Sequence, residues 1–273
     1  MIDALLATYA DPRFVSVGLI TVLLSAGAFL LFALPLTWLA ARDPAWARRW
    51  KIQNPRSAAV MSEEEAERRG ILVQGPRMVR ESLRASLRNN LAMLAVTVVA
   101  WPLMSLSAVH LGPLPAGWWW LFPLQLLFCI YLDDFLYYWM HRAMHTRWLL
   151  RRVHGRHHRV LAPWAITGHY MHPLEYVLTG SLAFLGPSLL GAHVALLWAW
   201  IVFRQWEAAE GHCGYAFPGS PTRWLPFSHG ALHHDAHHAR VRGNYAGFLA
   251  LWDRRFGTEV RDYQRLLQDW KTR

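Results

Sequence analysis

Histidines at the spacing of metal ligands dominate the second half of the chain. Fourteen of the fifteen histidines lie between residues 141 and 238. The segment "HRAMH" places His141 and His145 four residues apart, which puts both rings on one face of a helix. The pattern H-x-x-H-H then occurs twice, in "HGRHH" (154–158) and within "HHDAHH" (233–238). In each copy the first and third histidines are again four residues apart.

This density of imidazoles predicts a transition-metal centre. Histidines packed together as free bases would leave buried donors and acceptors unpaired, and as cations they would repel one another. Neutral imidazoles bound to a metal avoid both problems. Eight or more ligands exceed what one ion takes, so the sequence predicts two metal ions. Nitrogen ligands suit Fe, Zn, Cu or Ni, and the ligand type leaves the choice open.

The composition indicates that an integral membrane protein positions these histidines. Hydrophobic residues make up 54% of the chain and charged residues 17%, against about 25% in soluble domains. The 16 tryptophans fit the aromatic belts of a bilayer interface. With this hydrophobicity, the formal charge of +10 favours an anionic membrane surface over nucleic acid. Cys129 and Cys213 form no disulfide framework; Cys213, beside His212, is predicted to pack in the core, with metal binding as the alternative.

We expect an all-α membrane protein with about four transmembrane helical elements and a cytoplasmic His-rich helical cap. Full spans are predicted at residues 14–40 and 91–109, and a third begins at residue 118 and continues as the helix that carries His141. Residues 174–203 hold a single charge, Glu175, and are interrupted by glycines. About 30 residues with a central break predict two short half-spans in a helical hairpin.

A basic loop, residues 42–90, separates the first two spans. It holds eleven Lys/Arg against six Asp/Glu, whereas the N-terminal 13 residues hold one basic residue. The positive-inside rule places this loop in the cytoplasm, and the later spans then return every histidine group to that side. Within the loop, Ser62 is predicted to cap a helix. Residues 79–90 predict an amphipathic helix that lies on the membrane surface or is a solvated linker.

The histidine motifs carry a family resemblance. H-x-x-x-H and two copies of H-x-x-H-H beside apolar spans resemble the fatty acid hydroxylase and sterol desaturase superfamily of membrane di-iron enzymes. "APWAITGHYMHPLE", "EAAEGHCGYAFP" and "HHDAHHARVRGNYAGFLALWDRRFGT" resemble its C4-methylsterol oxidase branch in particular. Cholesterol hydroxylase-like members share H-x-G-Y and HHD-x-HH, but "HPLE" fits the C4-oxidase pattern better. The resemblance covers roughly residues 125–260, and residues 1–90 hold no such motif.

The resemblance implies a non-haem di-iron site with O₂ as co-substrate, although purified material would also accept Zn or another metal. The ligands carried over from the family are His141, His145, His154, His157, His158, His234, His237 and His238, with His212 of "GHCGY" as a ninth. Fatty acid 2-hydroxylases add a further histidine where this chain has Ala216. We hypothesise that His172 of "HPLE" provides the tenth ligand, which a His172→Ala variant with full metal content would contradict.

Two polar residues are predicted to support the ligands as catalytic residues. Asp134 lies seven residues before His141 on one helix face, where it would accept a ring N–H, or else cap or pair with Arg142. Asn244 follows the last histidine group and is predicted to orient it. Asp235 has the same alternatives as Asp134. The remaining histidines are predicted to be structural or to support the site from outside: His110, His169, His193, His229 and His233.

Together these features predict a mono-oxygenase that oxidises a C–H bond of a membrane lipid, in the sterol C4-methyl oxidase manner. The alternatives are a hydroxylase or desaturase of fatty acyl chains, carotenoids or another lipid on the same scaffold, and a non-catalytic metal binder or transporter. Electrons must come from a separate reductase, ferredoxin or cytochrome b₅-type donor, because the chain holds no motif for a flavin, haem or iron–sulfur cofactor. The membrane is the bacterial inner membrane or the endoplasmic reticulum, according to source.

The predicted domain organisation has three parts. Residues 1–124 form the N-terminal membrane spans with the basic cytoplasmic loop (42–90). Residues 125–262 form the fatty acid hydroxylase-like catalytic region, and residues 263–273 form a cytoplasmic C-terminal tail.

Overall fold

The computed structural model describes residues 2–53, 63–114, 116–247 and 249–271, and within them the regular elements are helical. The helices are α1 (Ile2–Ala10), α2 (Ile20–Arg42), α3 (Glu63–Arg68), α4 (Pro76–Met104), α5 (Trp118–Met144), α6 (Arg147–Arg152), α7 (Pro173–Leu189), α8 (Val194–Gly211), α9 (Ala231–Arg240), α10 (Ala250–Phe256) and α11 (Tyr263–Lys271). A π-helical segment, η1 (Phe14–Leu19), leads into α2, and two 3₁₀ segments, η3 (His154–Arg159) and η4 (Ala165–His169), lie between α6 and α7. The all-α prediction is confirmed.

Three helical segments are long and apolar enough to cross a bilayer: Phe14–Arg42, Pro76–Met104 and Trp118–Met144. Large apolar side chains on them face outward, such as Leu31 (68% exposed) and Val99 (79% exposed). Such exposure suits contact with lipid tails rather than water. The predicted first and third spans are confirmed.

The second span differs from the prediction. Residues 79–90 and the apolar residues after them form one continuous helix, α4, that ends at Met104 rather than at residue 109. Asn89 and Asn90 do not interrupt this helix, because their amides have partners: Asn89 Nδ2 donates to the carbonyl of His169 (3.1 Å) and Asn90 Nδ2 to that of Ser86 (2.9 Å). The predicted helix after Ser62 exists as α3, and Ser62 itself lies outside the described residues.

The predicted hairpin is present as α7 and α8. The turn between them contains Gly191, whose φ of 55° favours glycine. The ring of His193 then caps α8, since its Nδ1 accepts from the backbone N–H of Ala195 (3.1 Å). Within α7, Gly186 allows close approach to α5: a Cβ added there would lie 3.0 Å from Cys129 Sγ.

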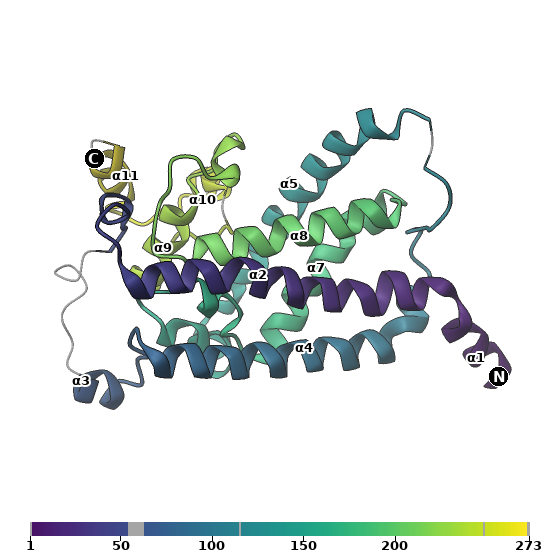
Figure 1. Ribbon diagram of the computed structural model, residues 1–273, viewed down its shortest axis with the longest axis horizontal. Helices are drawn as coiled ribbons and strands as arrows, with labels where there is room; N and C mark the ends of the chain where they lie inside the picture. The colour runs from purple at the N-terminus through teal and green to yellow at the C-terminus, as the bar shows by residue number, and fades with distance from the viewer. Residues whose placement is uncertain (1, 54–62, 115, 248, 272–273) are drawn as a thin grey trace.

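The two ends of the molecule differ. Figure 1 shows α2 and α4 running side by side along its length, with α9, α10 and α11 gathered at the end opposite the N-terminus. Helix α2 packs extensively on α8, and its Phe29 ring stacks on the His169 ring of η4 at 3.4 Å between centroids. These contacts hold α8 and η4, which lie next to histidine groups in the chain, against the long helix α2.

Candidate metal centre

Nine histidines from four segments converge at this end of the molecule. One group of possible metal ligands consists of His141, His145, His154, His158 and His237; the other consists of His157, His212, His234 and His238. Within each group the ligating nitrogens lie within 4.8 Å of one another, and all nine rings except that of His145 are buried. The segments are the end of α5, the η3 turn, the residue after α8, and helix α9. Each H-x-x-H-H copy contributes to both groups, because neighbouring histidines point in different directions.

The Nε2 atoms point inward in both groups. In the first, His141 Nε2 lies 3.0 Å from His154 Nε2, and His237 Nε2 lies 3.1 Å from His158 Nε2. In the second, His212 Nε2 lies 3.2 Å from His157 Nε2 and 3.0 Å from His234 Nε2. Two nitrogens bonded to one ion at about 2.1 Å, with angles of about 90–110°, would lie about 3.0–3.4 Å apart. The spacing therefore fits shared coordination of an ion in each group.

The opposite ring nitrogens fix the orientation of six of these histidines. Each Nδ1 lies 2.6–3.3 Å from an oxygen that can only accept: the carbonyls of Tyr245, Tyr170, Ala208, Gly243 and Val160 for His141, His157, His212, His237 and His238, and the carboxylate of Glu175 for His154. Nδ1 therefore carries the proton, and in the neutral ring Nε2 presents a bare lone pair.

The lone pairs require a cation. His141 and His154 both donate from Nδ1, so the 3.0 Å between their Nε2 atoms separates two acceptors, and the same holds for His157 and His212. Protons do not resolve this conflict, because burial and the neighbouring rings lower the pKa of His157 and burial lowers that of His212 to about 4. A metal ion accepts every lone pair at once, so these residues fit a resident metal in each group.

The predicted tenth ligand is not brought to either group. The Nδ1 of His172 accepts from the backbone N–H of Leu174 (3.2 Å), and the ring caps the N-terminus of α7. Cys213 also lies outside both groups: its Sγ contacts the backbone of Tyr215, and the side chain is buried in a core cluster with Phe29, as the packing alternative predicted.

The predicted supporting residues act on a loop rather than on the rings. Asp134 Oδ1 accepts from the backbone N–H of Gly247 (3.0 Å). Asn244, fully buried with a φ of 53°, donates from Nδ2 to the carbonyl of His233 and accepts on Oδ1 from Val260 N–H. Asp235, the third such residue, accepts on Oδ1 from Gln53 Nε2 (2.7 Å).

Glu175 is the contact that sequence reasoning missed. Its Oε1 lies 2.6 Å from His154 Nδ1, and both side chains are almost fully buried. The signal was present in the sequence, since Glu175 is the single charge of the apolar stretch 174–203. A lone carboxylate is costly to bury unless it has a partner, and the partner here is the ring of His154.

Comparison with known proteins agrees with this geometry. The family model for Fatty acid hydroxylase matches residues 126–258. A very-long-chain aldehyde decarbonylase from Oryza sativa subsp. indica is 39% identical over 185 residues, which cover 67% of this chain and 69% of the rice protein. The chain belongs to the fatty acid hydroxylase family. It is thus a membrane oxidoreductase of a metal-dependent oxygenase family, as the sequence resemblance indicated.

Methylsterol monooxygenases are similar over a shorter region. Methylsterol monooxygenase 2-2 from Arabidopsis thaliana is 41% identical over 145 residues, covering 52% of this chain and 54% of that protein. Methylsterol monooxygenase 1 from Rattus norvegicus is 42% identical over 142 residues, covering 52% and 48%. The aligned part is therefore about half of each. No solved structure matches the chain.

Proposed function

We propose that this protein is an O₂-dependent di-iron mono-oxygenase that oxidises a C–H bond of a sterol-type lipid. The observation that carries the proposal is the convergence of two sets of unprotonated Nε2 atoms beside a cavity that reaches into the membrane-spanning helices. We assign the nine converging histidines as the ligands, five to one iron and four to the other. The bound irons would supply the activation of O₂ and the oxidation of an inert C–H bond, which no side chain provides.

The cavity that supports a lipid substrate lies among four helices and has a volume of about 100 Å³. Helices α2, α4, α7 and α8 line it with apolar side chains, including Val22, Met93, Phe184, Leu197 and Ile201. Two of these helices belong to predicted spans, so an apolar ligand would reach the cavity from the bilayer.

A second cavity connects this space with the histidines. Its volume is about 40 Å³, and its lining includes His212 and His234 of the second group. Met171, Thr179, Arg204 and Ala208 line both cavities, so the two lie side by side. A lipid body in the apolar cavity would thereby place one carbon near the second histidine group, with the surrounding helices excluding water.

Polar side chains in the second cavity favour a sterol over a plain acyl chain. Arg204 Nε donates to Asp133 Oδ2 (2.9 Å) there, and Tyr137 and Glu207 line the same space. These groups would hydrogen-bond a hydroxyl beside the reacting carbon. In a 4-methylsterol the hydroxyl-bearing carbon adjoins the methylated carbon, whereas an acyl chain offers no polar group at its inert carbons. Hydroxylation or desaturation of fatty acyl chains, carotenoids or another lipid is the second candidate, and the rice decarbonylase is the relative that favours a long-chain substrate.

The remaining parts of the proposal follow from charge and topology. We propose that the histidine end faces the cytoplasm, because the described parts of the basic loop, residues 42–53 and 63–90, lie toward that end of the spans (Figure 1). Residues 125–262 would form the catalytic region, residues 1–124 the supporting spans with the basic loop, and residues 263–273 a cytoplasmic tail. A separate reductase, ferredoxin or cytochrome b₅-type protein would supply electrons.

The proposed function is tested by substrate conversion in proteoliposomes. Iron-loaded protein would be supplied with a chemical or ferredoxin reductant, ¹⁸O₂ and either a 4-methylsterol, its 3-deoxy analogue or a long-chain fatty acid. We expect ¹⁸O in the 4-methylsterol product and at least tenfold less conversion of the other two lipids. Incorporation into the fatty acid alone would establish the second candidate, and iron binding with no product from any lipid would contradict the oxygenase proposal.

A further inference from the structure

Two metal-binding rings of the first group depend on one loop, residues 243–247. The carbonyl of Gly243 accepts from His237 Nδ1 (2.7 Å), and the carbonyl of Tyr245 accepts from His141 Nδ1 (2.7 Å). Because these bonds fix the tautomer and direction of both rings, any shift of the loop would move two Nε2 atoms. The residue that holds the loop therefore controls the direction of two of the five rings in the first group.

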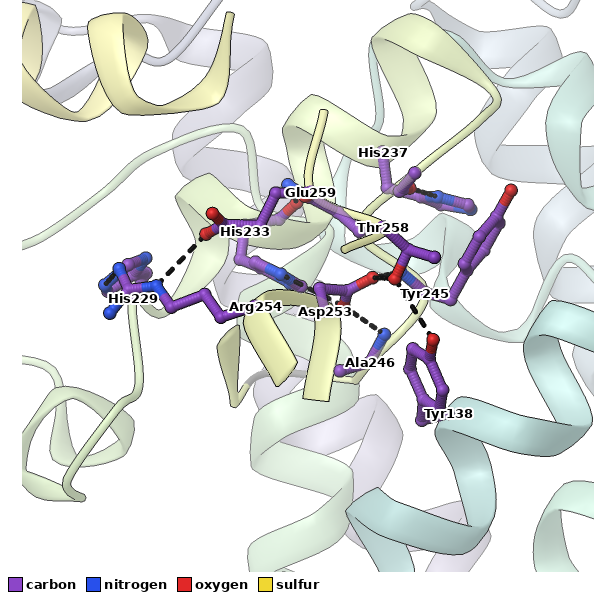
Figure 2. A network of polar contacts seen from close by, with 12 residues as sticks. Tyr138, His229, His233, His237, Tyr245, Ala246, Asp253, Arg254, Thr258 and Glu259 are labelled. Atoms are coloured by element: carbon purple, nitrogen blue, oxygen red, sulfur yellow. Dashed lines mark hydrogen bonds and ion pairs between the residues drawn. The ribbon is translucent and has the colours of Figure 1, made fainter. Parts of the chain in front are cut away.

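A buried carboxylate, Asp253 of α10, holds this loop. Its Oδ1 accepts from the backbone N–H of Tyr245 (2.8 Å) and its Oδ2 from that of Ala246 (2.8 Å). The hydroxyl of Thr258 donates a third bond to Oδ1 (2.6 Å), and the Asp253 side chain is fully buried. Figure 2 shows Asp253 at the centre of these contacts, with His237 on the far side of the loop.

We propose that Asp253 is a positioning residue of the metal centre: it fixes the loop carbonyls that orient His141 and His237. This inference rests on the proposed metal centre and assigns a role to a residue that lies outside both ligand groups. Asn244 supports the same arrangement through its bonds to His233 and Val260. Gly243 allows the loop to pass close to Thr258, since a Cβ at Gly243 would lie 2.9 Å from the carbonyl of Thr258.

The network also ties the loop to α5, which carries His141. The hydroxyl of Thr258 donates its single proton to Asp253, so Thr258 Oγ1 accepts from the hydroxyl of Tyr138 (3.1 Å). Arg142 Nη1 in turn donates to Tyr138 OH (3.0 Å). The loop and helix α5, which together position His141, are thus also joined through Asp253.

The charge of Asp253 is stabilised by three hydrogen-bond donors rather than by a neighbouring cation. The ring of His233 faces Oδ2 at 3.5 Å but makes no hydrogen bond to it. Asparagine has the same size but a single acceptor oxygen, and its NH₂ group would face a backbone N–H. Asp253→Asn should therefore release one end of the loop without creating a cavity.

The experiment compares Asp253→Asn with Asp262→Asn in the full-length protein loaded with ⁵⁷Fe. Asp262 pairs with Arg240 at the surface and makes a matched control for the change of charge. Mössbauer spectra and the rate of iron loss to a chelator are the readouts. We expect Asp253→Asn to alter one of two iron signals and to speed the loss of that iron at least tenfold, while Asp262→Asn matches wild type.

Two results would overturn the inference. Identical spectra and release rates in Asp253→Asn and wild type would show that the loop needs no carboxylate. If Asp253→Asn does not fold, the pair Thr258→Val and Thr258→Ser decides: only the valine variant, which lacks the hydroxyl donor, should perturb the iron signal, and equal behaviour of the two variants would overturn the inference. Wild-type protein that binds no iron would instead overturn the proposed function, and the inference with it.

Discussion

Replacing Glu175 should weaken metal binding by the first histidine group alone. Its Oε1 lies 2.6 Å from His154 Nδ1, and the exposed fractions of the two side chains are 3% and 0%. Neither water nor salt screens a pair this deeply buried. The carboxylate makes His154 a stronger donor to the metal and holds its ring toward the Nε2 atoms of His141 and His145.

The expected magnitude follows from what each substitution retains. Loss of such a partner lowers metal affinity by about 10–100-fold, or about 1.4–2.7 kcal/mol. Glu175→Gln keeps an acceptor oxygen of the same reach but loses the charge, so we expect about a tenfold loss. Glu175→Leu removes the acceptor altogether, so we expect about a 100-fold loss.

The assay is chelator competition on iron-loaded protein in detergent, with metal counted per chain at each chelator concentration. Glu259→Gln is the matched control, because Glu259 is a partly exposed carboxylate that lies outside both histidine groups and pairs with Arg254. One iron should be lost early in the Glu175 variants and the other at the wild-type concentration. A Glu175→Leu protein that holds both irons as tightly as wild type would refute the reasoning.

Three further predictions concern stability and ligand identity. Metal-free protein should lose stability as pH falls from about 6.5 toward 4. Burial lowers the pKa of His233 to about 3 and that of His212 to about 4, so over this range the unfolded chain binds protons that the folded chain does not. A melting temperature that does not change over this range would contradict the prediction. Gly186→Ala should lower the free energy of unfolding by about 1–3 kcal/mol, because the added Cβ crowds Cys129 Sγ. Adding Cys129→Ala should restore part of the lost melting temperature. Equal melting temperatures of Gly186→Ala and wild type would argue against the tight α5–α7 contact. His172→Ala should keep full metal content and lose about 1 kcal/mol of helix capping, and a loss of one iron would restore His172 as the tenth ligand.

The sequence predicted the ligands' neighbourhood well because spacing along a helix decides which rings share a face. His141 with His145, and His234 with His238 on α9, point together for that reason, whereas His154 and His158 come together from the 3₁₀ segment η3. Hydropathy likewise indicated the spans and the hairpin. Helix α4 was divided wrongly because Asn89 and Asn90 end a polar stretch, and the sequence does not show their long-range partners, the carbonyl of His169 and the hydroxyl of Tyr176.

The supporting contacts were less predictable because they join residues far apart in the chain. Asp134 and Asn244 were expected at the rings, yet Asp134 binds the backbone of the loop 243–247, and Asn244, within that loop, binds the backbone of His233 and Val260. Asp253 accepts a hydrogen bond from Tyr245, only eight residues earlier in the chain. The role of that bond depends on a second contact of Tyr245, with His141, which lies more than one hundred residues earlier. The spacing of residues along the chain does not predict such long-range contacts.

The central claim is that two irons bind, one in each histidine group, and metal content per chain tests it most directly. Protein would be purified without chelators from iron-supplemented cells, together with His237→Ala from the first group and His157→Ala from the second. The account predicts about two irons per wild-type chain, and the loss of a different iron, distinguished by its Mössbauer signal, in each variant. No tightly bound metal, or metal that neither substitution removes, would contradict it.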